Sequence, residues 1–280
     1  MSFSSEVKEE LSKLNTFSNL NYIYAEILGY LLSANIKEEK KKLEFSTSNE
    51  YNINRFAKML EKLEIAYNIK IIGKNFVIDF NKDKINFDLS IIKTQDEKRS
   101  LIRGAFMGGG LLNNPTNKYH LEILLSSENN KNIIKELLNE FEISVKELNR
   151  RNGYSIYIKD GESISNFLAL IGANSSVVRY EEIRVIKDKR NKVNRLVNCE
   201  TANLNKTIRA SLEQIEAINK IKANKKFDAL PDELKEVAEL RLKNTECSLS
   251  ELGSMLSKPI GRSGVNHRLN RIIKIANEIE

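Results

Sequence analysis

The strongest constraint on the fold of this chain is an internal repeat, in which residues of the same type recur at a constant offset. Residues 43–45 (LEF) recur as 121–123 (LEI), 78 positions later, and residues 49–50 (NE) recur as 127–128 (SE) at the same offset. Both copies show a helix rich in small residues, then a strand, an amphipathic helix and a β-hairpin. Chance similarity between two ordinary α+β stretches is the alternative, and agreement at one offset argues against it. The repeat predicts two αβαββ units forming one pseudo-twofold α+β domain.

The boundaries of the predicted elements follow from their periodicity. Apolar residues alternate with polar ones in the hairpins, and they recur every three or four residues in the amphipathic helices. The copies span about residues 20–95 and 96–188. The expected elements are small-residue helices over 24–35 and 100–110, amphipathic helices over 49–63 and 128–140, and hairpins joining 66–72 with 75–80 and 143–150 with 154–159.

Each small-residue helix carries two small side chains four positions apart. Gly29 precedes Ser33 in the first helix, and Gly104 precedes Gly108 in the second. Residues at i and i+4 share a helix face, and small side chains there let two backbones approach closely. A glycine inside a helix costs about 1 kcal/mol relative to alanine. We therefore expect the two helices to pack against each other at the pseudo-twofold axis.

The two helices resemble degenerate LAGLIDADG motifs, at ILGYLLSAN (27–35) and IRGAFMGGG (102–110). In LAGLIDADG homing endonucleases the equivalent helix pair forms the centre of the domain, and an acidic residue near the end of each motif holds the metal ions that cut DNA. Those positions here are Ala34 and Gly109, and no carboxylate lies within two positions of either. Two-metal hydrolysis needs oxygen ligands. We therefore expect this domain to be a scaffold that does not cut DNA and that binds no metal and no cofactor. The alternative is an active metal-dependent endonuclease.

The last quarter of the chain has the pattern of a helix-turn-helix. Pro231 is expected to begin a helix that runs to about Lys243, and a second helix is expected over 248–256. A break at 257–261 precedes a long helix that Ser263 is expected to cap. The apolar positions of this helix form one stripe: Val265, Leu269, Ile272, Ala276 and Ile279.

The other face of the long helix is basic and amide-rich, as a DNA recognition helix requires. Arginine matches the O6/N7 edge of guanine, and asparagine matches the N6/N7 edge of adenine. Asn266, Arg268, Asn270 and Arg271 are therefore expected to read bases, and Lys258, Arg262 and Lys274 to contact phosphates. A solvated basic face is the alternative. The full set of expected DNA-binding residues is Lys258, Arg262, Ser263, Asn266, His267, Arg268, Asn270, Arg271 and Lys274.

Positive charge is concentrated in two segments of a chain whose net charge is +7. Residues 183–211 hold eight basic and two acidic side chains, residues 256–275 hold five basic and none acidic, and the rest of the chain is therefore net −4. Such segments are typical of binding to a polyanion. We expect a domain over 1–188, a basic linker with helical segments over 189–211 and a helix-turn-helix domain over 212–280. Linker side chains that could contact phosphates are Arg190, Lys192, Arg195 and Lys206; a solvated helix between domains is an equally good interpretation.

The combination of motifs is similar to that of the WhiA family along essentially the whole chain. The motifs are MSFSSEVKEEL at the start, LIRGAFMGGGLLNNP in the middle, RNKVNRLVNCETANLNKT in the linker and SGVNHRLNRI near the end. The resemblance implies a non-catalytic LAGLIDADG-like domain joined to a sigma-factor-like helix-turn-helix domain. It also implies a bacterial DNA-binding protein, of a family named for sporulation regulation in actinomycetes and tied to cell division in other Gram-positive bacteria.

The leading hypothesis is a sequence-specific regulator that binds double-stranded DNA, is not an enzyme and lies in the cytoplasm at the nucleoid. No run of residues approaches the length of an apolar membrane span, and no membrane partner is expected. A rival hypothesis is a protein-interaction module that engages RNA polymerase, a sigma factor or the division machinery. The net negative charge outside the two basic segments favours a protein-binding role for the N-terminal domain.

Overall fold

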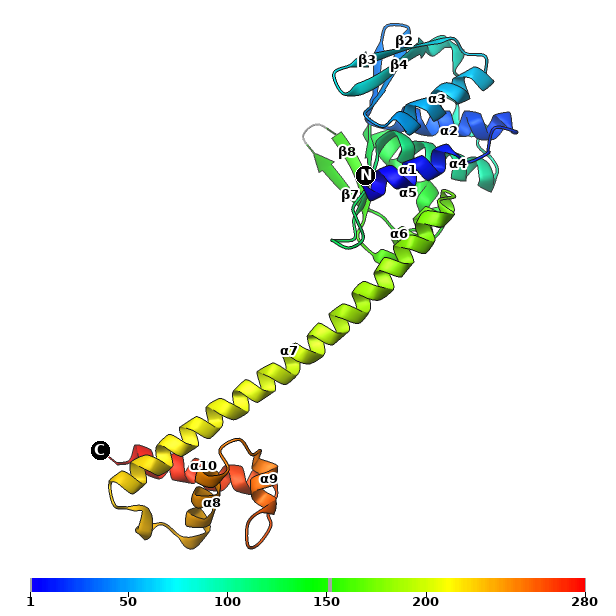
Figure 1. Ribbon diagram of the computed structural model, residues 1–280. Helices are drawn as coiled ribbons and strands as arrows, with labels where there is room; N and C mark the ends of the chain where they lie inside the picture. Colours follow the sequence, from blue (N-terminus) through cyan, green and yellow to red (C-terminus); the bar gives the residue numbers. More distant parts are fainter. Residues whose placement is uncertain (1, 151–152, 280) are drawn as a thin grey trace. The chain divides into compact units, whose positions relative to one another are not determined.

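The computed structural model describes residues 2–150 and 153–279, in two compact units (Figure 1). Unit 1 is Met1–Asp188 and unit 2 is Lys189–Glu280. No helix within the described ranges is long and apolar enough to cross a membrane. The elements of unit 1 are α1 (Phe3–Ser12), α2 (Leu20–Leu32), β1 (Ile36–Glu39), β2 (Lys42–Thr47), α3 (Glu50–Lys62), β3 (Tyr67–Ile72), β4 (Asn75–Asn81), α4 (Gln95–Gly109), β5 (Gly110–Leu112), β6 (Leu121–Leu125), α5 (Glu128–Glu140), β7 (Lys146–Arg150), β8 (Gly153–Ile158), α6 (Gly161–Leu170) and the start of α7 (Asn174–Ala223).

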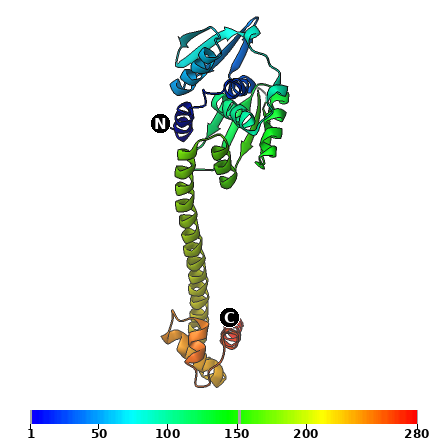
Figure 2. The same cartoon turned by 90° about the vertical axis from the view of Figure 1, so that its right-hand side faces the viewer.

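Unit 1 contains two antiparallel sheets of identical topology, which confirms the predicted α+β fold. Their strand orders are β1-β2-β4-β3 and β5-β6-β8-β7. In Figure 2 the strands of the first copy (blue to cyan) and of the second copy (green) lie on the two sides of the helix pair α2–α4. The register also repeats, because Phe45 pairs with Ile78 in one sheet and Ile123 pairs with Ile156 in the other. All four side chains are buried in the core of the unit.

The predicted αβαββ order was wrong by one strand, since each copy is αββαββ. The additional strands are β1 and β5, which directly follow the helix pair. The sequence of β1 (IKEE) has no apolar alternation and is largely exposed, and β5 has only three residues. Neither strand has a periodic signal of its own. Each is stabilised by pairing with the longer strand beside it.

Helices α2 and α4 approach each other closely along their small residues. A Cβ atom added to Gly29 would lie 2.0 Å from the Leu101 carbonyl oxygen, and one added to Gly104 would lie 1.9 Å from the Glu26 carbonyl oxygen. Near the C-terminal ends, a Cβ on Gly108 would lie 2.5 Å from Ser33 Oγ. Backbone and short side chains therefore occupy the space that larger residues would need.

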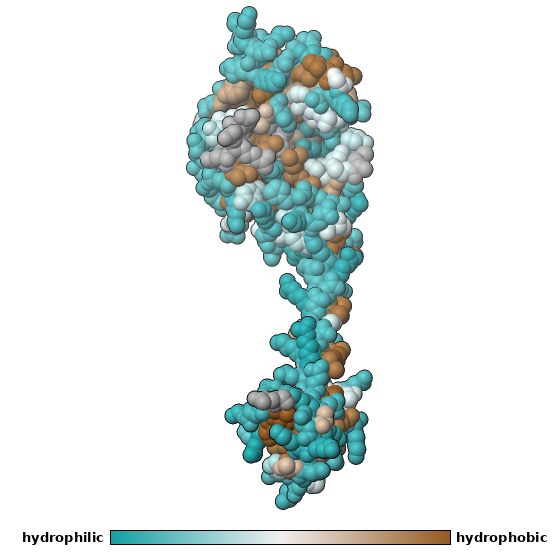
Figure 3. All heavy atoms as spheres, turned by 90° about the vertical axis from the view of Figure 1, so that its left-hand side faces the viewer, coloured by the Kyte–Doolittle hydropathy of each residue, from teal (hydrophilic) through white to brown (hydrophobic). Residues whose placement is uncertain are grey.

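Unit 2 is a helical bundle around a separate apolar cluster. It comprises the remainder of α7, α8 (Asp232–Lys243), α9 (Leu249–Ser254) and α10 (Arg262–Asn277). The cluster joins Ile218 and Ile221 of α7 to residues of the three shorter helices. Residues 189–211 are helical throughout, as part of the 50-residue α7. In Figure 3 exposed apolar groups (brown) lie in patches along one edge of this helix, whose visible face is otherwise hydrophilic.

The starts of the three shorter helices differ in how they are capped. Helix α8 begins one residue after Pro231, and α9 begins with a capping box in which Ser248 and Glu251 bond to each other's backbone N–H groups. The predicted Ser263 cap was wrong, because α10 already begins at Arg262, with Gly261 as the N-cap residue. The Ile260 N–H donates to the Gly253 carbonyl at 3.1 Å, which closes the turn before Gly261.

Candidate nucleic-acid interface

Helix α10 has one buried face and one exposed polar face. Val265, Leu269, Ile272 and Ala276 are buried in the apolar cluster of unit 2. Since a helix turns 100° per residue, the remaining positions lie together on the opposite side. The exposed members of the predicted DNA-binding set on this helix are Arg262, Ser263, Asn266, His267, Asn270, Arg271 and Lys274. The helix thus presents hydrogen-bond donors and positive charge from Arg262 to Lys274.

Arg268 differs from the other residues of the set. Its Nη2 atom lies 3.0 Å from Glu233 Oε2 of α8, and its side chain is only 20% exposed. The ion pair therefore connects α10 to α8 at a partly exposed position. Its guanidinium would have to leave Glu233 before it could reach a base edge.

The turn between α9 and α10 is tight enough to fix the angle between the two helices. A Cβ added to Gly253 would lie 2.2 Å from the carbonyl oxygen of Ile260. Lys258, the remaining member of the predicted set, is exposed in this turn. The α9–turn–α10 segment has the short connection that a helix-turn-helix requires.

A cavity of about 350 Å³ within unit 2 unites residues of the predicted linker with residues of α10. Lys206 of α7 and Arg262 and Asn266 of α10 all line it. Hydroxyl groups of Thr207, Ser211, Ser248 and Ser250 complete much of the lining. Three of the residues expected to contact DNA are thereby brought together from two distant parts of the sequence.

Arg241 lines the same cavity, and no sequence pattern predicts it there. Its side chain is 1% exposed, and its Nη1 donates to the Cys247 carbonyl at 2.8 Å. Among the described residues neither its Nε nor Gln214 Oε1 has a hydrogen-bond partner. Burial lowers the pKa of Arg241. Its position in an amphipathic helix gave no signal, because a basic residue in the last turn of a helix is ordinarily exposed.

The other predicted phosphate contacts in the linker lie on the surface. Arg190, Lys192 and Arg195 are exposed on α7. Exposed Arg and Lys side chains can contact phosphate oxygens without reading the base sequence. These three residues are accessible to a phosphate backbone, but they do not line the cavity that contains Lys206.

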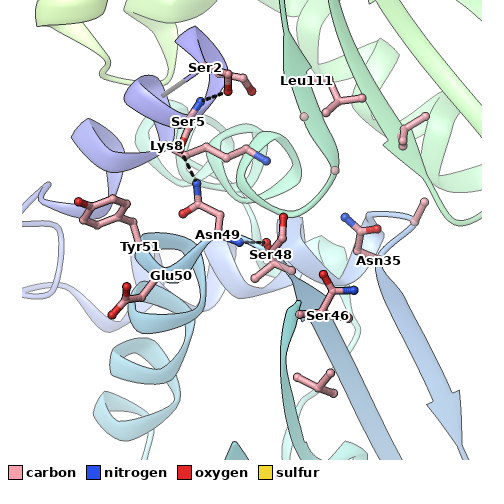
Figure 4. Close-up of a pocket in the computed structure, with 18 of the residues that line it drawn as sticks. Ser2, Ser5, Lys8, Asn35, Ser46, Ser48, Asn49, Glu50, Tyr51 and Leu111 are labelled. Atoms are coloured by element: carbon pink, nitrogen blue, oxygen red, sulfur yellow. Dashed lines mark hydrogen bonds between the residues drawn. The ribbon is translucent and has the colours of Figure 1, made fainter. Parts of the chain in front are cut away.

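Unit 1 contains a cavity of about 940 Å³ (Figure 4), at the positions predicted to be those of a degenerate nuclease. Ala34 and Gly109 both line it, and the Ala34 N–H donates to the Leu124 carbonyl at 3.1 Å. A Cβ added to Gly109 would lie 2.2 Å from the same carbonyl oxygen. A carboxylate side chain thus has no room at position 109 without a shift of the backbone.

The acidic residues that remain near this cavity are dispersed. Glu44 Oε1 accepts a hydrogen bond from Lys70 Nζ at 2.8 Å, and Glu50 lies in the first turn of α3. Across residues 2–150 and 153–279, no group of three or more His, Cys, Asp or Glu side chains is arranged to hold a metal ion.

Comparison with known proteins identifies both units. Residues 27–97 and 98–190 match the model of the WhiA LAGLIDADG-like domain, and residues 193–276 match the WhiA C-terminal HTH domain. The chain is 44% identical over 245 residues to the probable cell division protein WhiA of Clostridium tetani, covering 86% of this chain and 74% of that protein. It is 36% identical to the corresponding protein of Staphylococcus haemolyticus, covering 100% and 98% of the two chains.

A solved structure shares the fold over the whole length. The crystal structure of full-length WhiA from Thermatoga maritima is 29% identical, with a TM-score of 0.62 that covers 100% of this chain and 99% of the other. The family matches span the repeated domain and the helical unit, and the relatives above 30% identity span most of the chain. The chain therefore belongs to the WhiA family.

Proposed function

We propose that this protein is a sequence-specific regulator that binds double-stranded DNA through α10 and performs no nuclease chemistry. The observation that carries the proposal is the exposed polar face of α10, opposite a buried apolar stripe in a helix-turn-helix. Asn266, Asn270 and Arg271 would contact base edges in the major groove. Arg262, Lys274 and Lys258 would contact phosphates and set the register.

The cavity that joins α7 to α10 supports a larger phosphate-binding surface. Lys206 and Arg262 lie on its wall, and the buried Arg241, whose Nη1 donates to the Cys247 carbonyl, adds a third cation. A phosphate oxygen accepts charge-assisted hydrogen bonds from such groups. Arg190, Lys192 and Arg195 would extend this surface along the basic segment of α7.

The nuclease alternative is disfavoured by the geometry around Gly109. Cleavage by the metal-dependent mechanism needs carboxylate ligands close to the scissile phosphate. The alanine at position 34 has no carboxylate. The Leu124 carbonyl occupies the space that a side chain at position 109 would need. The unit 1 scaffold would then serve binding alone.

The proposed regulatory role rests on the relatives of this chain, which are named probable cell division proteins. We propose that the protein acts at the nucleoid in the control of division or sporulation. RNA polymerase or a sigma factor would be its protein partner if unit 1 docks onto the transcription machinery. Enrichment of polymerase with the intact protein, but not with unit 2 alone, would be the expected result of a pull-down.

Fluorescence anisotropy with duplex DNA across a salt series tests the DNA-binding role. The test variant is Arg271→Ala/Lys274→Ala, and the matched control is Lys58→Ala/Lys62→Ala, which removes the same charge from exposed positions of α3. Because each phosphate contact releases about one counterion, we expect the slope of log K against log salt to decrease by about 2 in the test variant only. The DNA is incubated with Mg²⁺ and should stay uncut.

Two outcomes would contradict this proposal. Equal affinity and slope in the test and control variants would remove α10 from the DNA interface. Site-specific nicking in the presence of Mg²⁺, abolished by a chelator, would instead support the endonuclease.

A further inference from the structure

The cavity in unit 1 is built from both copies of the repeat and from α1. Figure 4 shows side chains from α1, from the start of α3 and from the strands converging on one space. Ala34 and Asn35 follow the end of α2, and Gly109 and Gly110 close the end of α4. The cavity thus lies where the helix pair meets the two sheets.

Two helix N-termini open onto this cavity. Helix α1 begins after Ser2, and helix α3 begins after Asn49. The Asn49 Nδ2 donates to Ser5 Oγ at 3.1 Å, which holds the two helix starts together. The N-terminal end of a helix carries partial positive charge and backbone N–H groups that no carbonyl of the helix accepts.

Lys8 extends from α1 into the same space (Figure 4). Its Nζ lies 5.7 Å from the centre of the Phe106 ring, and no described carboxylate pairs with it. Burial lowers the pKa of Lys8 to about 8, because water is removed from the ammonium without a compensating charge. The helix that carries Lys8 is anchored, since Phe3, Val7 and Leu11 are buried in the core.

The charged groups around the cavity leave a positive balance. Lys8 and Lys37 line it together with Glu44 and Glu50. Glu44 is already bonded to Lys70, so one carboxylate faces two cations. Ser2, Ser46, Ser48 and Asn35 add hydroxyl and amide donors to the lining.

We propose that this cavity binds the phosphate group of a small phosphorylated molecule, a function separate from DNA binding by α10. Lys8, Lys37 and the two helix N-termini would hold the phosphate, as helix N-termini and lysines do in other phosphate sites. Ile72, Val77 and Leu111 line the cavity as well and would contact the apolar or planar part of the ligand. The inference does not rest on the proposed DNA interface.

The surfaces beside the cavity favour a small molecule over a duplex. Lys42 is bonded to Asp79 at 3.1 Å and Lys70 to Glu44 at 2.8 Å, so the cations of the neighbouring strands are neutralised. Residues 1–188 contain 27 basic and 26 acidic side chains. Ile72 and Leu111 are 57% and 51% exposed at the rim. A nearly neutral, partly apolar rim does not attract a DNA backbone.

Isothermal titration calorimetry with pyrophosphate and the full chain tests the site. The test variant is Lys8→Met, and the control is Lys62→Met, which removes the same charge from an exposed position of α3. We expect Lys8→Met to weaken binding by about tenfold or more and Lys62→Met to leave it unchanged. Circular dichroism checks that both variants are folded.

The pH dependence supplies a second readout. In the unaltered protein affinity should fall as the pH rises from 7 to 9, because Lys8 loses its proton near its lowered pKa. Pyrophosphate gains negative charge over this range, which would act in the opposite direction. In Lys8→Met the fall should be absent.

Three results would overturn the inference. The first is equal pyrophosphate affinity in Lys8→Met and Lys62→Met. The second is loss of pyrophosphate binding in Arg271→Ala/Lys274→Ala instead, which would place the anion on α10. The third is a loss of duplex affinity in Lys8→Met as large as its loss of pyrophosphate affinity, which would assign the cavity to the DNA backbone.

Discussion

At the scale of single residues, the core of unit 1 depends on a buried charge network. Arg55 Nε donates to Glu26 Oε1 at 2.5 Å and Arg55 Nη2 to Glu26 Oε2 at 2.8 Å. Arg103 Nη1 donates to the same Oε2 at 3.2 Å. Glu26 and Arg55 are each 1% exposed. One carboxylate on α2 therefore bridges a guanidinium group on α3 and another on α4.

Replacing that carboxylate should be costly. Glu26→Gln leaves Arg55 and Arg103 buried without an anion, and we expect a loss of about 3–5 kcal/mol in the free energy of unfolding. Urea denaturation followed by circular dichroism measures it. Glu162→Gln, an exposed substitution of the same type on α6, should change the value by less than about 0.5 kcal/mol. Similar values for both variants would show that the network contributes little.

Lys8 makes stability depend on pH in a defined window. Its pKa is about 8 in the folded protein and 10.5 in an unfolded chain, so the unfolded state binds more protons between these values. The free energy of unfolding should therefore rise by at most about 3 kcal/mol from pH 8 to 10.5, relative to Lys8→Met. Denaturation midpoints of both proteins across this range test the prediction. Parallel pH profiles would contradict it.

The residues of the candidate DNA interface were largely identifiable from the sequence. An apolar stripe at spacings of three and four placed the polar positions of α10 on one face, as in Asn270 and Lys274. The ion pair of Arg268 with Glu233 was not predictable, because it depends on how α8 packs against α10. Arg241 was missed for the same reason: its burial results from packing between elements distant in sequence.

At the scale of elements, the α2–α4 pair tolerates no side chain at its crossing. Gly104→Ala would place a Cβ 1.9 Å from the Glu26 carbonyl oxygen and force the helices apart. We expect a loss of about 3 kcal/mol or more in the stability of unit 1. Thermal denaturation tests this, with Gly153→Ala as the control because no heavy atom lies within 4 Å of its added Cβ. Equal melting temperatures would mean that the helices separate without cost.

The turn of the helix-turn-helix has its own steric requirement. Gly253→Ala would bring a Cβ to 2.2 Å from the Ile260 carbonyl oxygen, so the turn must open and α10 must tilt relative to α9. We expect duplex affinity to fall by about tenfold or more while the unfolding midpoint of unit 1 is unchanged. In Gly261→Ala the added Cβ meets nothing within 4 Å. Gly261→Ala should therefore retain its duplex affinity. If both variants lost duplex affinity, the cause would be the backbone freedom of glycine and not the steric contact at Gly253.

At the scale of the whole molecule, the two units differ in net charge, and each has its own apolar core. Residues 189–280 hold 18 basic and 12 acidic side chains, whereas residues 1–188 are nearly balanced, so the net negative charge outside the basic segments does not lie in the N-terminal domain as expected. Each unit has its own buried cluster. We propose that the chain divides functionally at the predicted boundaries, with residues 212–280 as the smallest DNA-binding domain and 189–211 as a basic extension.

Three fragments test that division. Fragments 189–280 and 212–280 should both fold, because the apolar cluster of unit 2 begins at Ala217. The longer one should bind duplex DNA more tightly and with a steeper salt slope, since it retains Arg195, Lys206 and the other basic residues of the segment. Fragment 1–188 should bind weakly. Identical salt slopes for the two C-terminal fragments would exclude the segment from the interface.

The sequence by itself determined the repeat, the close helix pair, the absence of carboxylates at Ala34 and Gly109, and the polar face of α10. These features follow from periodicity and residue type, which are local properties of the chain. Only the tertiary structure decided the additional strands β1 and β5, the position of Arg241 and the cavity around Lys8. Such features arise where elements distant in sequence pack together, because burial and electrostatic environment depend on neighbours that the local pattern does not specify.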